Sequence, residues 1–213
     1  YLSLDYEKLV TSITEKTSYM KYIDIFSELN IDSYYKTDSH WRQEKILPIA
    51  KKLAGEMGIS LNAEYSKTPF DNEFYGVYFG QYAMPIDSEA MYYLKNDITD
   101  NAVVFDYQNQ KNIEVYKSTK GVLRDSYETF LGGPLSLVTI ENENATTDKE
   151  LIMFRDSYGS SLAPLFIEGY KKITLIDIRY MHPNMIEQFV EFNNQDVLFI
   201  YSTSVLNNSE TLK

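Results

Sequence analysis

Ser157 is the residue of this sequence best placed to act as a nucleophile. It lies in the segment Arg155-Asp156-Ser157-Tyr158-Gly159, after an apolar run that ends at Phe154 and before a helical pattern that begins at Leu162. In open α/β sheets such strand-to-helix turns lie at the carboxyl edge, where backbone N–H groups can stabilise a developing oxyanion. The hydroxyl therefore suits acyl-ester chemistry, although the same turn also suits a serine that only caps the helix.

A serine nucleophile normally needs a base, and the chain has only two histidines, His40 and His182. His40 follows Asp38 by two residues, so in an extended segment both side chains project to the same side and the carboxylate could orient the imidazole. His182 precedes Pro183 and has no adjacent carboxylate. Taken alone, the Asp38-x-His40 spacing also fits a surface loop or a partial metal site, but we identify no further metal ligands. We therefore expect no metal and no cofactor.

Composition narrows the classes of function. The net charge is −11, with 31 acidic and 20 basic residues. No basic stripe could neutralise a phosphate backbone, so nucleic acid is not an expected partner. The negative charge favours neutral glycans or small esters over polyanions as substrates. The 19 tyrosines could stack on sugars, although packing is their commoner use. Cysteine is absent, which excludes disulfides and a cysteine nucleophile.

The hydrophobic pattern predicts the elements that must position these residues. In the C-terminal half, apolar strands alternate with helical segments, which is typical of a parallel sheet covered on both faces. The predicted strands are 135–140, 151–154, 173–178 and 197–201, and the predicted helices are 162–170 and 184–193. No internal repeat or linker interrupts the chain, so we expect a single domain over residues 1–213.

Two amphipathic helices are predicted in the N-terminal part by apolar residues at helical spacing, over 3–17 and 46–57. Pro48 either kinks the second helix or marks a later start. No apolar stretch approaches the roughly 20 residues that a membrane-spanning helix needs. Because Tyr1 begins without Met or a leader pattern, we expect the chain to be trimmed at its N-terminus.

The middle of the chain gives a weaker signal. Residues 102–107 and 113–118 are two β-rich runs separated by five polar residues, which predicts a β-hairpin. In residues 59–100 the apolar residues follow neither helical nor strand spacing, and residues 67–72 are predicted to form a loop.

Several segments match, in the same order, a pattern of one protein family. They are Tyr34-Tyr35-Lys36-Thr37-Asp38-Ser39-His40-Trp41, Phe74-Tyr75-Gly76, residues 127–133, residues 155–159 running into 162–166, and residues 176–180. The set resembles the bacterial DHHW proteins, with Ser39 where that name has a histidine. These proteins are relatives of the alginate O-acetyltransferases in the SGNH hydrolase superfamily. The resemblance spans residues 34 to 201.

This resemblance implies a three-layer, flavodoxin-like α/β fold of the SGNH hydrolase type with a parallel sheet and a β-hairpin insertion. It also implies a circularly permuted order, because the Asp-x-His element precedes the serine. By the resemblance, Ser157 is the nucleophile, His40 the general base and Asp38 its orienting carboxylate. The backbone N–H groups of Gly76 and Ser157 would form the oxyanion hole, with Gly80 as an alternative to Gly76.

Four further residues are expected to bind substrate: Arg155, Trp41, Arg179 and Asn207. The asparagine of the SGNH signature has no firm match in this chain. Asn207 is one candidate for it, and Asn208 is the other.

The leading hypothesis is an O-acetyltransferase or acetylesterase that acts on a cell-surface or exported glycan, in an extracytoplasmic location. By analogy with the family, a membrane acyltransferase could supply the acetyl group. A noncatalytic carbohydrate-binding or surface-assembly module on the same fold is the alternative, and a cytoplasmic hydrolase of small esters is the third. The sequence leaves transfer and hydrolysis unresolved.

Overall fold

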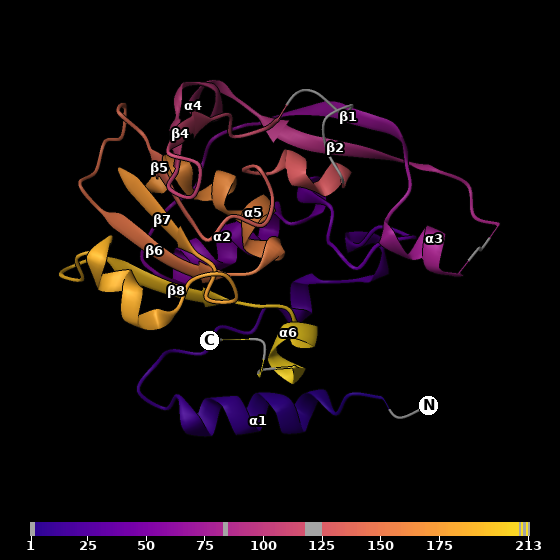
Figure 1. Ribbon diagram of the computed structural model, residues 1–213, viewed down its shortest axis with the longest axis horizontal. Coiled ribbons are helices and arrows are strands. Elements are labelled where there is room, and N and C mark those ends of the chain that lie inside the picture. Colours follow the sequence, from indigo (N-terminus) through magenta and orange to yellow (C-terminus); the bar gives the residue numbers. More distant parts are fainter. Residues whose placement is uncertain (1–2, 83–84, 118–124, 209, 211, 213) are drawn as a thin grey trace.

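A six-stranded mixed sheet forms the centre of the computed structural model, which describes residues 3–82, 85–117, 125–208, 210 and 212 (Figure 1). Its strands lie in the order β4-β3-β5-β7-β6-β8. Their bounds are β3 Val103–Asp106, β4 Lys111–Ile113, β5 Leu137–Glu141, β6 Glu150–Arg155, β7 Lys172–Ile176 and β8 Asp196–Ile200. The four strands predicted in the C-terminal half are all present, to within two residues at each end.

The expected parallel sheet is only partly present. β6 pairs in parallel with β7 and with β8, whereas β5 pairs antiparallel with β7 and with β3. Four consecutive residues of β5 are buried, and a strand buried on both faces gives no period-2 signal that distinguishes the two directions. The chain therefore has a mixed α/β fold, and the finer flavodoxin-like, permuted arrangement stays a prediction.

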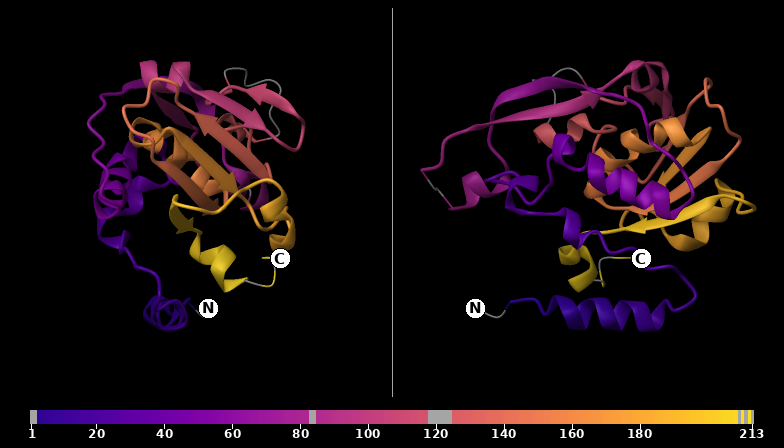
Figure 2. Two further views of the ribbon diagram at one scale, coloured as in Figure 1. Left: turned by 90° about the vertical axis from the view of Figure 1, so that its left-hand side faces the viewer. Right: turned by 180° about the vertical axis from the view of Figure 1, so that it is seen from behind.

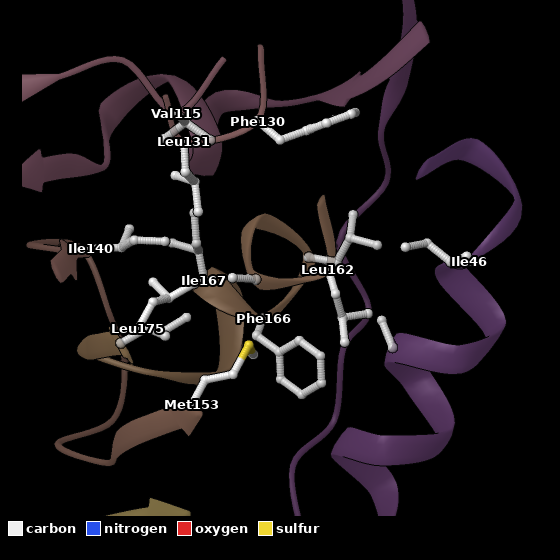
Figure 3. Close-up of a cluster of buried hydrophobic side chains, with 14 of the residues drawn as sticks. Ile46, Val115, Phe130, Leu131, Ile140, Met153, Leu162, Phe166, Ile167 and Leu175 are labelled. Carbon is white, nitrogen blue, oxygen red and sulfur yellow. The ribbon is translucent and has the colours of Figure 1, made fainter. Parts of the chain in front are cut away.

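Side chains of β6 alternate between two hydrophobic clusters. Leu151 and Met153 belong to the larger cluster, and Ile152 and Phe154 to the smaller one. Because successive side chains of a strand point to opposite faces, the sheet is covered by apolar contacts on both sides. Figure 3 shows Met153 in the larger cluster beside Phe166.

Helices cover the face of the sheet that carries the larger cluster. They are α2 Leu47–Glu56, α5 Ser157–Leu162 and the 3-10 helix η6 Ala163–Gly169. Pro48 lies in the first turn of α2, where its missing N–H costs nothing, so the later start is confirmed and the helix has no internal proline. The helix expected over 162–170 is instead the short α5 followed by η6.

The opposite face packs on η7 Pro183–Gln188, which contributes the buried Ile186 to the smaller cluster. A longer helix was expected here, over 184–193. Only this 3-10 segment forms, so that expectation was wrong in type and length. Other helical segments are η1 Phe26–Glu28, η2 Ile31–Ser33, η3 Gln43–Lys45, α4 Asp97–Asn101, η5 Ser126–Thr129 and α6 Thr203–Asn207.

A two-stranded antiparallel ribbon, separate from the six-stranded sheet, was not predicted from the sequence. It pairs β1 Ser66–Phe74 with β2 Glu89–Lys95, and β1 includes the predicted loop over 67–72. The register shifts twice, between Pro69 and Asp71 and again before Phe74. Such irregularities break the alternation by which a strand is recognised, and an internal proline lowers the strand signal further. The short helix α3 Val77–Tyr82 follows β1 directly.

The predicted hairpin is confirmed as β3 and β4. Asp106 closes its turn, because Oδ1 accepts hydrogen bonds from the N–H groups of Gln108 and Asn109. The second strand begins and ends earlier than expected: β4 spans Lys111–Ile113, so it shares only Ile113 with the predicted strand over 113–118 and takes two residues of the predicted turn. Ser118, the last residue of the predicted strand, lies outside the described residues.

The N-terminal helix α1, Tyr6–Lys16, confirms the first amphipathic pattern and is capped by Asp5. None of its residues is fully buried. Figures 1 and 2 show it at the periphery, with α6 between it and the sheet. Among the described residues, no helix has both the length and the apolar character needed to cross a membrane.

Candidate active site

Ser157 occupies the turn that the sequence predicted for it. β6 ends at Arg155, Asp156 is the N-cap, and Ser157 is the first residue of α5. The Asp156 carboxylate accepts hydrogen bonds from the N–H of Tyr158 at 2.9 Å and from the N–H of Ser202 at 2.8 Å. It therefore holds the start of α5 against the chain that follows β8. Ser157 itself remains partly exposed.

A glycine is required in the first turn of α5. A Cβ atom on Gly159 would overlap the Cβ of Arg155 and lie 3.0 Å from its Cγ. Because both atoms belong to the stem of a buried side chain, they could not move aside cheaply. Gly159 thus lets the helix pack closely on the end of β6.

The Asp38 carboxylate fixes the conformation of the segment that carries His40. Asp38 Oδ1 accepts a hydrogen bond from the backbone N–H of His40 at 2.9 Å, and the same oxygen lies 2.5 Å from His40 Nδ1. The N–H of Tyr35 donates to the His40 carbonyl at 3.2 Å. These bonds turn the imidazole toward α5.

His40 Nε2 lies 2.7 Å from Ser157 Oγ, although the two residues are 117 positions apart in the sequence. Asp38, His40 and Ser157 therefore form one hydrogen-bonded series, which we call the Asp–His–Ser cluster. The Asp38 side chain is fully buried, whereas 15% of the His40 side chain is exposed. Such an arrangement can move a proton from the hydroxyl to the imidazole while the carboxylate balances the new charge.

Asp38 is held in its ionised form. Burial raises the pKa of this carboxyl, but hydrogen bonds from the His40 ring, the His40 N–H and the Val77 N–H outweigh burial and bring the pKa below its usual value. The bond from Val77 is 3.1 Å long and reaches the second carboxylate oxygen. Both oxygens of Asp38 thus have donors.

Gly76 adjoins the cluster in a way that differs from the expectation. Its N–H donates to Thr37 Oγ1 at 2.8 Å, so this donor is already engaged and we do not retain it for the oxyanion hole. A Cβ atom at this position would lie 2.5 Å from the Thr37 carbonyl oxygen and 2.7 Å from Asp38 Oδ2. Gly76 is needed for close backbone approach. Gly80, the alternative, lies in α3, and a Cβ added there would meet nothing within 4 Å.

Two residues expected to bind substrate are buried instead. Arg155 is fully buried and donates to the Leu135 carbonyl at 3.1 Å, with Asp177 Oδ2 at 3.8 Å. Trp41 is 2% exposed and donates from Nε1 to Ser161 Oγ at 2.7 Å. Neither side chain is available to a ligand, so both expectations are wrong. A sequence cannot show that an arginine or tryptophan beside a catalytic motif points inward.

The other two candidates remain at the surface. Arg179 is partly exposed and makes two hydrogen bonds to Asp177, at 2.9 and 2.7 Å. Asn207 is an exposed residue at the end of α6, and the Asn208 amide donates to the Ser204 carbonyl of the same helix. Substrate binding by Arg179 or Asn207 stays a prediction.

Two tyrosines that sequence reasoning did not single out surround His40. The Tyr127 ring stacks on the imidazole, with centroids 3.9 Å apart and planes 14° apart. The Tyr158 ring lies 5.5 Å away at 44°, and its hydroxyl donates to the Ser39 carbonyl. Both tyrosines lie inside segments that matched the family pattern. That match was the one signal that could have identified them.

Two exposed aromatic residues belong to the segment whose backbone contacts Thr37 and Asp38. Tyr75 precedes Gly76, is 46% exposed, and packs against Phe79 with ring centroids 4.2 Å apart. Tyr78 is 39% exposed, and its N–H donates to the Thr37 carbonyl. Flat, partly exposed rings of this kind can stack on sugars.

Comparison with known proteins supports the fold. No protein-family model matches the sequence, and no curated protein matches it. Among solved structures, the chain is similar to a DHHW family protein from Eubacterium siraeum, with a TM-score of 0.73 and 24% identity over 99% of this chain and 77% of that one. At the level of the fold, the resemblance to the DHHW family is confirmed.

PatB1 of Bacillus cereus is a second similar structure. With a sulfonyl adduct it matches at a TM-score of 0.64, and a further PatB1 structure matches at 0.58, both at 20% identity over 82% of this chain. The chain spans 62% and 64% of the two PatB1 chains. At such identities the likeness concerns the fold.

Proposed function

We propose that this protein is a serine-dependent acyl-ester enzyme, an O-acetyltransferase or acetylesterase, whose substrate is a cell-surface or exported glycan. The observation that carries the proposal is the 2.7 Å separation of Ser157 Oγ and His40 Nε2, with Asp38 on the other ring nitrogen. A buried carboxylate, an imidazole and a partly exposed hydroxyl in this order are what nucleophilic acyl transfer needs.

In the first half of the reaction, His40 Nε2 accepts the proton of Ser157 as Oγ attacks the carbonyl carbon of the ester. The Ser157 N–H, at the start of α5, donates to the oxyanion. The tetrahedral intermediate then collapses, the bond to the alcohol oxygen breaks, and His40 returns the proton to that oxygen. Asp38 stabilises the imidazolium throughout.

In the second half, water or a sugar hydroxyl attacks the carbonyl carbon of the acyl-serine, and His40 accepts its proton. The bond between that carbon and Ser157 Oγ then breaks, and His40 returns the proton to Oγ, which restores the free serine. Water gives hydrolysis, and a sugar hydroxyl gives transfer. The exposed rings of Tyr75 and Tyr78, in the segment whose backbone contacts Asp38, favour a sugar as substrate or acceptor. We further propose an extracytoplasmic location, with a membrane acyltransferase as the source of the acetyl group.

Labelling with a sulfonyl fluoride tests the proposal directly, because these reagents modify activated serines and PatB1 is known with a sulfonyl adduct. We expect intact-protein and peptide mass spectrometry to locate one sulfonyl group on Ser157. Labelling should be lost in Ser157→Ala and slowed in His40→Ala. Hydrolysis of p-nitrophenyl acetate should fall on the order of 10³-fold or more in both variants.

The control is His182→Ala, which removes the other histidine, at the N-cap of η7. This variant should keep wild-type labelling and turnover. Ester hydrolysis that persists in Ser157→Ala would exclude Ser157 as the nucleophile.

A noncatalytic carbohydrate-binding or surface-assembly module is the second candidate, favoured by the exposed aromatic rings of Tyr75 and Tyr78. It predicts glycan binding that is unchanged in Ser157→Ala and lost in Tyr75→Ala, without any acyl-enzyme. An acetyl adduct on Ser157, detected by mass spectrometry after incubation with an acetyl ester, would exclude it.

A further inference from the structure

We propose that Ser161 and Tyr127 are positioning residues that hold the His40 imidazole in line with Ser157, an inference that rests on the proposed function. Tyr127 contacts the face of the imidazole and makes no hydrogen bond to either ring nitrogen. Ser161 acts one step further away, through its hydrogen bonds to Tyr127 and Trp41.

Ser161 joins three segments through one buried hydroxyl. It lies one helical turn after Ser157 in α5 and is fully buried. Its Oγ accepts hydrogen bonds from Tyr127 Oη at 2.6 Å and from Trp41 Nε1 at 2.7 Å, and it donates to the Tyr158 carbonyl at 3.2 Å. One donor and two acceptor positions are all that a hydroxyl has, so its capacity is used in full.

Ser161 therefore connects the segment of the base, His40, with the helix of the nucleophile, Ser157. Trp41 follows His40 in the chain, and Ser161 belongs to the helix that begins with Ser157. The bond between Trp41 and Ser161 therefore ties the His40 segment to α5 independently of the bond between His40 and Ser157. Gln43 reinforces the tie, because its side chain donates to the Ser161 carbonyl at 2.7 Å.

Tyr127 restrains the imidazole itself. Bonds at Nδ1 and Nε2 fix two edges of the ring in its plane but resist tilting out of that plane only weakly. A parallel ring at 3.9 Å opposes such tilting by contact. Tyr127 is in turn fixed by its bond to Ser161 and by the Phe130 ring at 4.9 Å.

The stacked ring also suits the charge that develops on His40. A cation over the face of a tyrosine ring is attracted by the quadrupole of that ring, so an imidazolium is favoured over a neutral imidazole there. Burial raises the pKa of the Tyr127 phenol well above its usual value, so the phenol remains neutral and remains a donor to Ser161.

The test compares Tyr127→Phe and Ser161→Ala, each of which removes one hydroxyl without adding volume. We expect each to lower kcat for p-nitrophenyl acetate about tenfold, with KM changed less than twofold, because misplacing the base affects the transition state and not substrate binding. The double variant should be about as impaired as Ser161→Ala alone, since the Tyr127–Ser161 bond that Tyr127→Phe removes is already lost in Ser161→Ala.

Tyr170→Phe is the matched control. Tyr170 is also a fully buried tyrosine with one side-chain hydrogen bond, from Oη to Asp196 Oδ2 at 3.0 Å, at the start of β8 and thus at the opposite edge of the sheet. It should lose comparable stability and keep the wild-type kcat. Tyr127→Leu, which removes the ring as well, should lower kcat further than Tyr127→Phe.

Wild-type kcat in both Tyr127→Phe and Ser161→Ala would overturn the inference, as would a fall no larger than in Tyr170→Phe at equal melting temperature. If Tyr127→Leu does not fold, the two hydroxyl variants decide the question alone. A wild-type protein that neither hydrolyses esters nor accepts a sulfonyl group on Ser157 would contradict the proposed function instead. The two failures are therefore distinguishable.

Discussion

Asp38 is the most constrained residue of the Asp–His–Ser cluster, because its two carboxylate oxygens serve different parts of the chain. Oδ1 binds the backbone and ring of His40, and Oδ2 binds the N–H of Val77 at the start of α3. Removing the charge would leave these donors with a weaker acceptor. Asp38 thus combines a chemical role in the proposal with a structural role in the fold.

Asp38→Asn should lower turnover of an acetyl ester by about 10³- to 10⁴-fold, because an amide cannot hold the imidazole in the required tautomer or balance its positive charge. Steady-state kinetics with p-nitrophenyl acetate measure the effect. An Asp38→Asn variant with wild-type kcat would exclude the orienting role of the carboxylate.

Asp38→Asn should also lower the stability of the fold by an amount that depends on pH. Because the pKa of Asp38 is lower in the folded chain than in the unfolded chain, the ionised carboxylate stabilises the fold above the ordinary aspartate value of about 4. That contribution is lost as the pH falls through the lowered pKa. The difference in free energy of unfolding between wild type and Asp38→Asn should therefore be largest at pH 7 and should decrease below about pH 4.

Urea denaturation of both proteins at pH 7 and at pH 3 measures this gap. An equal gap at the two pH values would contradict the lowered pKa. Asp24→Asn offers a control at an exposed carboxylate of the same type, and at pH 7 it should lower the stability less than Asp38→Asn does.

At the scale of elements, the junction between β1 and α3 is what encloses Asp38. Gly76 forms this junction, and its backbone lies against Thr37 and Asp38 with no room for a side chain. The two N–H groups at the junction, those of Gly76 and Val77, donate to Thr37 Oγ1 and Asp38 Oδ2. The ribbon of β1 and β2 thereby contributes to the site without supplying a reactive group.

Gly76→Ala should push the junction away from Asp38, because the new methyl group would overlap backbone and side-chain atoms that are fixed on both sides. We expect a loss of stability of about 1–3 kcal/mol and a lower kcat. Gly80→Ala, four residues later, is the control: its Cβ meets nothing within 4 Å, and it should leave kcat unchanged. Equal behaviour of the two variants in thermal denaturation and kinetics would contradict this role for Gly76.

At the scale of the whole molecule, Arg155 connects the strands beneath the site. It ends β6, donates to the Leu135 carbonyl before β5, and faces Asp177 after β7. Burial lowers the pKa of its guanidinium, while the nearby Asp177 opposes that shift. The arginine thus supports the carboxyl edge of the sheet from inside the protein.

Arg155→Met should destabilise the fold by about 3–5 kcal/mol, because it removes one partner of a buried charge pair. In the fraction that remains folded, KM for an ester should change little, since no ligand reaches this side chain. A raised KM with unchanged stability in Arg155→Met would restore the substrate-binding interpretation.

Local sequence patterns predicted much of the fold, and the resemblance to a known family joined the separate motifs into a candidate site. Short-range periodicity identified α1, α2 and the strands of the C-terminal half, because helix and strand periods are properties of neighbouring residues. The positions of Asp38 and His40, and of Ser157 at a strand-to-helix turn, were also readable. Short motifs and the order of the matching segments carried that information.

Only the tertiary structure decided which side chains meet and which are hidden. The 2.7 Å contact between His40 and Ser157 joins residues 117 positions apart, and the direction of β5 depends on its pairing with β7. The inward orientation of Arg155 and Trp41, and the stacking of Tyr127 on His40, depend on packing between distant elements. Residue type and spacing constrain local conformation, whereas burial and long-range contacts arise only when the whole chain folds together.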